Sequence, residues 1–227
     1  MSRWFALLAC AAAVAGCSAL PESAAQRRQS TAAPSPARTV AVARSAEAGQ
    51  CLARLGQTGA RYSALPDRYV DQGCAIVGTV QLASLASDRS QLGVSNLGPV
   101  TCEVSQAFTG WARYGVDRAA RQILGSPVRS IETMGSFACR NVAGSGRRSA
   151  HATGAAIDIG GFVLEDGRRI MVKSAWHGGT EREREFLRVV QQSACKRFDT
   201  VLGPEYNSAH HDHLHLEGVI GTKSYCR

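Results

Sequence analysis

Apolar residues recur every three or four positions in two stretches of the chain, and this spacing is typical of amphipathic helices. The first stretch covers residues 101–124 and ends at Gly125-Ser126-Pro127. The second begins with a capping-box pattern formed by Thr180 and Glu183 and continues to about Cys195. The pattern therefore predicts two helices that each bury one face.

Other runs alternate between apolar and polar residues or are rich in β-branched side chains, which predicts strands. Two of these runs are joined by the turn Glu165-Asp166-Gly167. The predicted strands cover residues 128–134, 155–162, 168–172, 200–202 and 211–216. Together with the helices they predict an α+β fold, a small antiparallel sheet with helices packed on one side.

The first 16 residues have the organisation of a signal peptide, with Arg3 before an unbroken apolar run and small residues at its end. The run is shorter than the roughly 20 apolar residues that a membrane-spanning helix needs. Its end, Val14-Ala15-Gly16-Cys17, resembles the bacterial lipobox, in which the cysteine is lipidated and becomes the first residue of the mature protein. Ser18 at the next position favours the outer membrane in Gram-negative bacteria. We therefore expect a lipid-anchored periplasmic protein; an ordinary cleaved signal peptide is the alternative.

The composition of the chain changes after the predicted lipidation site. Residues 18–50 contain Ala, Ser, Pro, Gln and Arg but almost no large apolar side chain, which predicts a flexible tether over 17–50. Residues 51–227 are about the right length for one domain with its own core. The formal net charge is +8, but the charges are scattered and export is expected. An anionic wall polymer or a membrane surface is therefore a better partner than nucleic acid.

The cysteines predict disulfides. Six of them are left once Cys10 is removed with the signal peptide and Cys17 is reserved for lipid: Cys51, Cys74, Cys102, Cys139, Cys195 and Cys226. An even number of dispersed cysteines in an oxidising compartment favours three bridges, and the absence of a CxxC pair argues against zinc binding by cysteine. Many pairings are open; pairing by nearness along the chain predicts Cys51–Cys74, Cys102–Cys139 and Cys195–Cys226.

Histidines are unevenly distributed along the chain. Five of the six lie in two short segments, residues 149–158 and 210–215. If the second segment is a strand, His213 and His215 share one face while the leucines that follow each of them share the other. One face is then rich in imidazole, and the opposite face belongs to the core.

The first of these segments can supply further ligands for a metal. Gly154 permits a tight bend, so His151 can lie on a loop and Asp158 on the strand that follows. Two imidazoles and one carboxylate leave one position of a tetrahedral zinc open for water, as a catalytic zinc site requires. A surface histidine cluster that binds metals adventitiously is the alternative.

The two segments carry a resemblance to a known group. The pattern S-x-H-x-x-G-x-A-x-D over residues 149–158, followed by H-x-H at His213 and His215, resembles the LAS metallopeptidases. These are peptidoglycan D-Ala-D-Ala carboxypeptidases and endopeptidases. Within that group, the stretch from Cys51 to Cys226 is similar to the extensin-like C-terminal domain family of bacteria. Further matching pieces cover residues 135–140 and 211–216.

The resemblance implies the metal and its ligands. It makes His151, Asp158 and His215 the ligands of a Zn²⁺ ion. It also places His213 beside the water that the metal activates, where the imidazole can take up and return a proton.

Two more residues receive roles from the resemblance. Arg140 would contact a carboxylate or carbonyl oxygen of the substrate, and His210 lies where penicillin-insensitive murein endopeptidases carry a further active-site histidine. In one respect the chain departs from the pattern. Several LAS branches place a glutamate before the last ligand as general base, whereas this segment offers His210, His211, Asp212 and His213. Strand alternation puts His211 on the same face as His213 and His215, whereas the resemblance favours His210, so a bend before the strand must decide between them. Alternation places Asp212 off this face, where it can orient a histidine.

The predicted function is zinc-dependent hydrolysis of D-amino-acid-containing peptide bonds in peptidoglycan stems or cross-links, by an endopeptidase or a carboxypeptidase. A non-catalytic peptidoglycan-binding lipoprotein that uses the same cleft is the first alternative. A periplasmic zinc storage or delivery protein is the second, although such a protein would carry a mobile His-rich tract instead of ligands dispersed along the chain.

Overall fold

The computed structural model describes residues 45–227. The predicted signal peptide, the lipidation site at Cys17 and the tether up to residue 44 lie outside the described residues. Between residues 45 and 227, no helix has the length and apolar character needed to cross a membrane.

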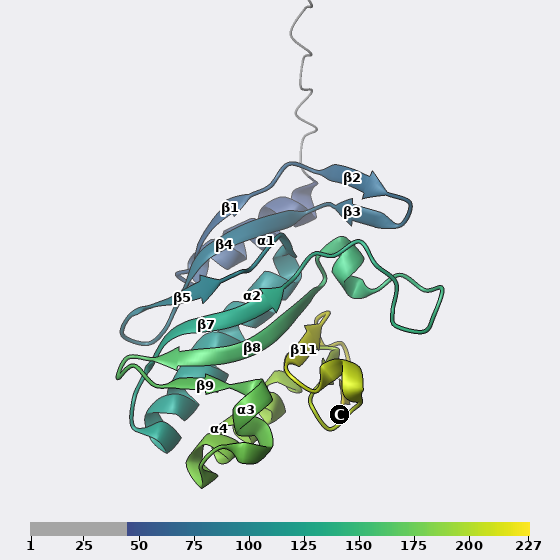
Figure 1. The fold of residues 1–227 in the computed structure, drawn as a ribbon. Coiled ribbons are helices and arrows are strands. Elements are labelled where there is room, and N and C mark those ends of the chain that lie inside the picture. The colour runs from purple at the N-terminus through teal and green to yellow at the C-terminus, as the bar shows by residue number, and fades with distance from the viewer. Residues whose placement is uncertain (1–44) are drawn as a thin grey trace, which may run out of the picture. The chain divides into compact units, whose positions relative to one another are not determined.

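A mixed sheet of ten strands forms the centre of the fold (Figure 1). Eight of its strands follow one another in the order β1 (Arg61–Ala64), β4 (Thr79–Ala86), β5 (Gln91–Ser95), β7 (Val128–Gly135), β8 (Ala156–Leu164), β11 (Leu214–Glu217), β10 (Thr200–Leu202) and β12 (Tyr225–Cys226). The remaining two are β6 (Val100–Thr101), which pairs with β4, and β9 (Arg169–Met171), which pairs with β8. A separate hairpin consists of β2 (Arg68–Asp71) and β3 (Cys74–Ile76).

The α+β class is confirmed, but the sheet is larger than predicted and is not wholly antiparallel. The pairs β5–β7 and β10–β12 are parallel, and the other pairs are antiparallel. The chain can return in parallel from β5 to β7 because the helix predicted over residues 101–124 lies between them. This long helix provides the crossover that such a connection needs.

Within residues 45–227, four α-helices accompany the sheet: α1 (Ala46–Gln57), α2 (Cys102–Trp111), α3 (Val172–Gly178) and α4 (Glu181–Ala194). The predicted helix over residues 101–124 is confirmed, since α2 continues as π-helical turns to Leu124 and ends at Gly125 with a φ of 73°. The predicted capping box of Thr180 and Glu183 is also present at the start of α4. Helix α1 begins at Ala46, so residues 46–50, assigned above to the tether, are helical.

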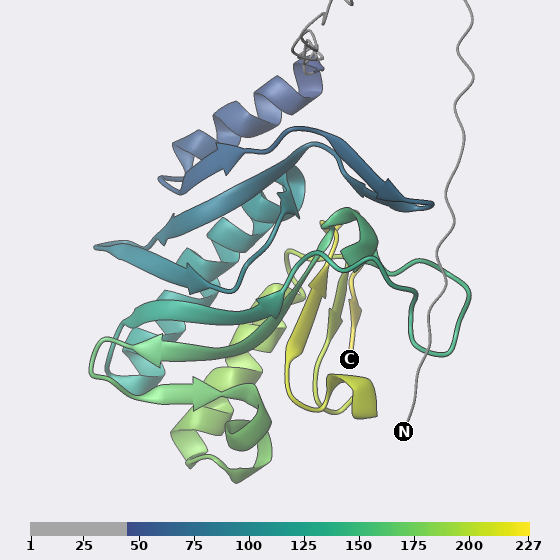
Figure 2. The same ribbon diagram turned by 45° about the horizontal axis from the view of Figure 1, so that its top comes forward.

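The long helix and α4 pack closely against each other and against the sheet (Figure 2). Trp111 lies with its ring 6.1 Å from that of Phe162 on β8, and its Nε1–H donates to the Val190 carbonyl of α4 at 2.9 Å. Gly115 permits this approach, because a Cβ there would lie 2.1 Å from the Ser193 hydroxyl oxygen. Strand β8, which carries one of the predicted ligands, is thereby packed against the core.

All six cysteines of residues 51–227 form disulfides, as predicted, but two of the three predicted pairs are wrong. The bridges are Cys51–Cys102, Cys74–Cys139 and Cys195–Cys226. Cys51 lies on α1, which packs against the start of α2. Cys74 begins β3, and this hairpin lies beside the loop after β7. Tertiary packing, which the spacing of cysteines does not report, therefore decides both of the pairs that were predicted wrongly.

Candidate metal centre

The antiparallel pairing of β8 with β11 brings two of the predicted ligands together. Asp158 and His215 are direct partners in the register, and Nδ1 of His215 lies 2.9 Å from Oδ1 of Asp158. Residues opposite each other on adjacent strands project to the same face of a sheet. Both residues are nearly buried, with exposed fractions of 9% and 6%.

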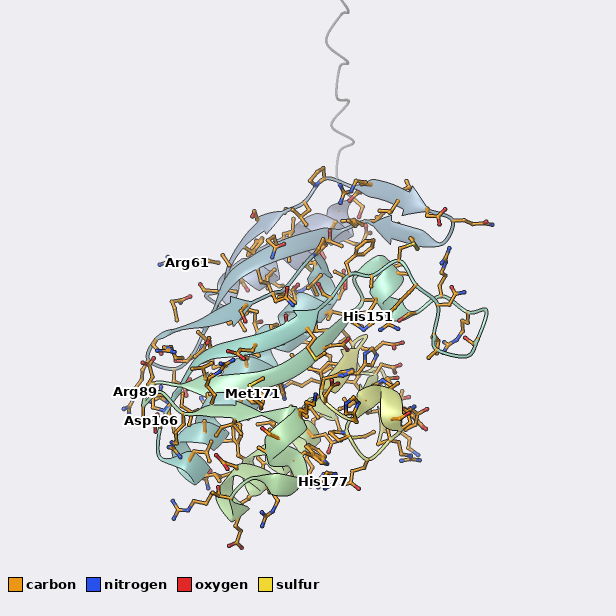
Figure 3. All side chains as sticks on the ribbon, viewed as in Figure 1. Arg61, Arg89, His151, Asp166, Met171 and His177 are labelled. Atoms are coloured by element: carbon orange, nitrogen blue, oxygen red, sulfur yellow. A yellow bond between two sulfur atoms is a disulfide. The ribbon has the colours of Figure 1, made fainter. Side chains whose placement is uncertain are left out.

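The third ligand comes from a short 3-10 turn, η3 (Ala150–Thr153), directly before β8. The Ser149 hydroxyl caps this turn by accepting from the His151 backbone N–H, and Gly154 closes it with a left-handed φ of 67°. Gly154 also has no room for a side chain, because a Cβ would lie 2.8 Å from the Pro99 carbonyl oxygen. The turn thus aims the His151 ring back toward the C-terminal segment that carries β11 (Figure 3).

The three side chains converge on one point. Nε2 of His151 lies 3.2 Å from Nδ1 of His215 and 3.2 Å from Oδ2 of Asp158. Two ligands of a tetrahedral zinc, each about 2.0–2.1 Å from the ion, are about 3.3 Å apart. The observed separations therefore fit such an ion with only small adjustment. Residues 151, 158 and 215 are also the group of potential metal ligands found within residues 45–227.

The ring nitrogens that point away from the centre are also bonded. Nδ1–H of His151 donates to the Ser136 carbonyl oxygen at 3.0 Å, and Nε2–H of His215 donates to Glu217 Oε2 at 3.0 Å. These bonds fix each ring so that the other nitrogen faces the centre. Neither Ser136 nor Glu217 was predicted. A backbone carbonyl has no sequence signal, but the alternation from His215 to Glu217 places that carboxylate on the same strand face.

The His-rich segment is not the continuous strand that was predicted over 211–216. Asn207 caps a 3-10 turn, η4 (Ser208–His210), and β11 begins only at Leu214. The prediction that alternation places His211 on the metal face is therefore wrong. The His211 side chain is 60% exposed, with Nδ1 bonded to the Ser208 carbonyl. His210 lies at the centre instead, its ring 5.7 Å from that of His215.

His213 lies beside the candidate ligands from a turn that precedes the strand. Its Nε2 is 3.5 Å from Oδ1 of Asp158, and its Nδ1–H donates to Asp212 at 2.9 Å. This bond lowers the pKa of the Asp212 carboxyl. The ring of His213 is 5.2 Å from that of His210, and the Nδ1–H of His210 donates to Asn207 at 2.7 Å. Each of these two histidines therefore keeps Nε2 available to a substrate or a proton.

Arg140 occupies the loop between β7 and η3. Its backbone carbonyl accepts from the Ser149 N–H at 3.1 Å, so the loop is tied to the start of the ligand-bearing turn. Its side chain is exposed, and its charge adds a smaller contribution to burial and the neighbouring histidines in lowering the pKa of His210. Within residues 45–227 the guanidinium has no hydrogen-bonded or ionic partner, which leaves it available to an anionic group.

The electrostatics of the metal-free centre are dominated by the buried carboxylate. Burial alone would raise the pKa of Asp158, but hydrogen bonds from His151 and His215 hold it well below its usual range. Burial would likewise lower the pKa of His215, yet its bonds to Asp158 and Glu217 raise it to about 9. Burial and the neighbouring histidines lower the pKa of His210 to about 4. The centre therefore holds positive charge on the ring that faces two carboxylates, a position that a divalent cation can take.

Comparison with protein families assigns the chain. Residues 49–227 match the family described as extensin-like protein C-terminus, and the chain belongs to this family. Searches among curated proteins and among solved structures gave no match. The resemblance to LAS metallopeptidases rests on the two motifs alone.

Proposed function

We propose that this protein is a zinc-dependent peptidase that hydrolyses peptide bonds in peptidoglycan stems or cross-links, at bonds that involve D-amino acids. The observation that carries the proposal is the convergence of His151, Asp158 and His215 within 3.2 Å of one another, beside a third histidine that is held by a carboxylate. Two imidazoles and one carboxylate are a ligand set of catalytic zinc sites, which keep one position open for water or substrate.

The metal and the chain have separate tasks in this proposal. Zinc supplies a Lewis acid that polarises a carbonyl and makes water a nucleophile at neutral pH. His213, oriented by Asp212, takes a proton at Nε2 from the attacking water and passes it to the leaving amine nitrogen. The exposed guanidinium of Arg140 contacts a substrate carboxylate or the oxygen on which negative charge develops.

The expected cell location supports a wall polymer as substrate. A lipobox at Cys17 and three disulfides fit a protein held by lipid on the periplasmic side of the outer membrane. In that compartment, peptidoglycan stem peptides are anionic chains that carry free carboxylates, which suits the unpartnered charge of Arg140.

Digestion of purified sacculi tests the proposal. The metal-depleted protein is reconstituted with zinc and incubated with sacculi, and mass spectrometry identifies the muropeptides released. We expect new peptide termini only with the zinc-loaded wild type, and none with the chelated protein or with Asp158→Asn. Binding to sacculi without any cleavage would contradict the peptidase and favour a peptidoglycan-binding lipoprotein.

A further inference from the structure

Glu217 is a half-buried carboxylate whose partner is a candidate metal ligand. It lies at the end of β11, two residues after His215, and its Oε2 accepts from Nε2 of that ring at 3.0 Å. Its side chain is 35% exposed. Within residues 45–227 no lysine or arginine lies within 4.0 Å of it, so the imidazole is its one ionic partner there.

The position of Glu217 is fixed by backbone pairing on both sides. It stands opposite Ala156 of β8 and opposite Thr200 of β10, and the next residue, Gly218, donates its N–H to the Ala155 carbonyl. The backbone that carries the carboxylate is therefore paired on both sides. A flexible surface glutamate gains little from an ion pair, because holding it in place costs side-chain entropy. Here the backbone is already ordered by the strand, and the side chain is only 35% exposed, so less freedom is lost than at the surface.

We infer that Glu217 is a positioning residue for the metal, acting through His215. This inference rests on the proposed metal centre. By accepting from Nε2–H, Glu217 keeps the lone pair of Nδ1 directed at the point shared with His151 and Asp158, and its negative charge makes the ring a stronger donor to a cation. Glu217 and Asp158 together also offset both charges of a divalent ion.

The expected effect is on metal affinity. Loss of a carboxylate that orients a metal-bound histidine costs about 10–100-fold in metal affinity. Glu217→Ala should therefore weaken zinc binding by about that factor. Glu217→Gln keeps an oxygen that can accept the hydrogen bond but removes the charge, so its loss should be smaller.

Zinc titration against a chromophoric chelator measures this effect without any assay of hydrolysis. Glu132→Gln is the matched control, because Glu132 is also a partly exposed strand glutamate with a single partner, Arg169 at 2.7 Å. A second readout is the visible absorption spectrum of the Co²⁺-substituted protein, which should change in both Glu217 variants and stay unchanged in Glu132→Gln.

The outcomes separate this inference from the proposed function. Wild type that binds no zinc would overturn the metal centre and this inference together. Tight binding by wild type and by both Glu217 variants, with identical cobalt spectra, would overturn the role of Glu217 and leave the metal centre standing. Equal weakening in Glu217→Gln and Glu132→Gln would show a general loss of stability and would also overturn it.

Discussion

His213 and Asp212, although neighbours in the chain, form a side-chain hydrogen bond of 2.9 Å between Nδ1 and Oδ1. The bond turns Nε2 of His213 toward the candidate metal centre, where it lies 3.5 Å from Asp158. The arrangement is similar to that of other hydrolytic sites, in which a carboxylate orients the imidazole that transfers the proton. It separates the residue that moves protons from the residues that hold the metal.

Replacing His213 should affect turnover and leave the metal in place. His213→Ala is expected to keep nearly stoichiometric zinc while turnover falls by roughly 10²–10⁴-fold, the usual range for lost general acid–base catalysis. His215→Ala should lose zinc and activity together. Metal analysis of the purified variants beside kinetics on a defined muropeptide distinguishes the two. If His213→Ala lost zinc as fully as His215→Ala, His213 would be a fourth ligand and a closed binding site would replace the peptidase.

The two adjacent histidines of the turn should differ sharply. The ring of His210 lies 5.2 Å from that of His213, whereas His211 is 60% exposed and bonds to a backbone carbonyl. His210→Ala should lower kcat/KM by on the order of 10- to 100-fold, because the rings beside the metal lose a packing partner. His211→Ala serves as the control and should change it less than about twofold. Equal losses in the two variants would contradict this assignment.

The metal-free protein should lose stability as the pH rises above neutral. The pKa of His215 is raised from its ordinary value of 6.5 to about 9, so its charged form stabilises the folded state. That contribution is fully present below pH 6.5 and is lost as the pH rises through about 9. Zinc needs neutral imidazole, so the loaded protein should lack this dependence. Urea unfolding with chelator at several pH values measures it, and His215→Ala should abolish the slope.

Removing the Cys74–Cys139 bridge should affect both stability and substrate binding. The bridge closes a long loop, so the double change to serine should cost about 2–4 kcal/mol of unfolding free energy. Because Arg140 directly follows Cys139, KM should rise more than kcat falls. The matched control replaces Cys51 and Cys102, which join two helices and flank no predicted site residue. A rise in KM in both double variants would refute the special role of the first bridge.

The close packing at Gly115 leaves no room for the methyl group of an alanine. Its Cβ would lie 2.1 Å from Ser193 Oγ and 3.0 Å from Trp111 Cδ1, so Gly115→Ala should destabilise the fold by about 1–3 kcal/mol. Adding Ser193→Gly should recover part of that loss. Gly110→Ala is the control, since its nearest neighbour is the guanidinium of Arg197 at 3.5 Å. Chemical denaturation of the four proteins checks the order, and a neutral Gly115→Ala would contradict the packing.

Periodic patterns predicted those parts of the fold in which one face is buried over several residues. The helix over 101–124, the capping box of Thr180 and the strand over 128–134 are of this kind. The strands before residue 101 were not predicted, and two of them, β1 and β2, have four residues each and no buried one. All four residues of Arg68–Asp71 are exposed, for example, so no apolar alternation marks them.

The ligand segments of the candidate centre could be predicted because the spacing of histidine, glycine and aspartate along the chain matches a metal-binding pattern. The local conformation before β11 could not, because the turn capped by Asn207 precedes β11 and the strand begins only at Leu214, three residues later than alternation predicted. Because of this turn, His210 and not His211 lies beside the candidate ligands. Glu217 escaped for another reason: its role depends on which nitrogen of His215 faces the centre, and that is a property of the folded pair.

Because the ligands depend on the register between β8 and β11, metal binding would report whether these two strands have paired correctly. Asp158 is opposite His215, and the residues on either side of His215 are leucines. A slip of one residue would put a leucine opposite the carboxylate and turn the imidazole to the other face of the sheet. A chain that binds zinc with all three ligands has therefore already paired β11 with β8 in the correct register, so metal occupancy would distinguish correctly folded from misregistered molecules.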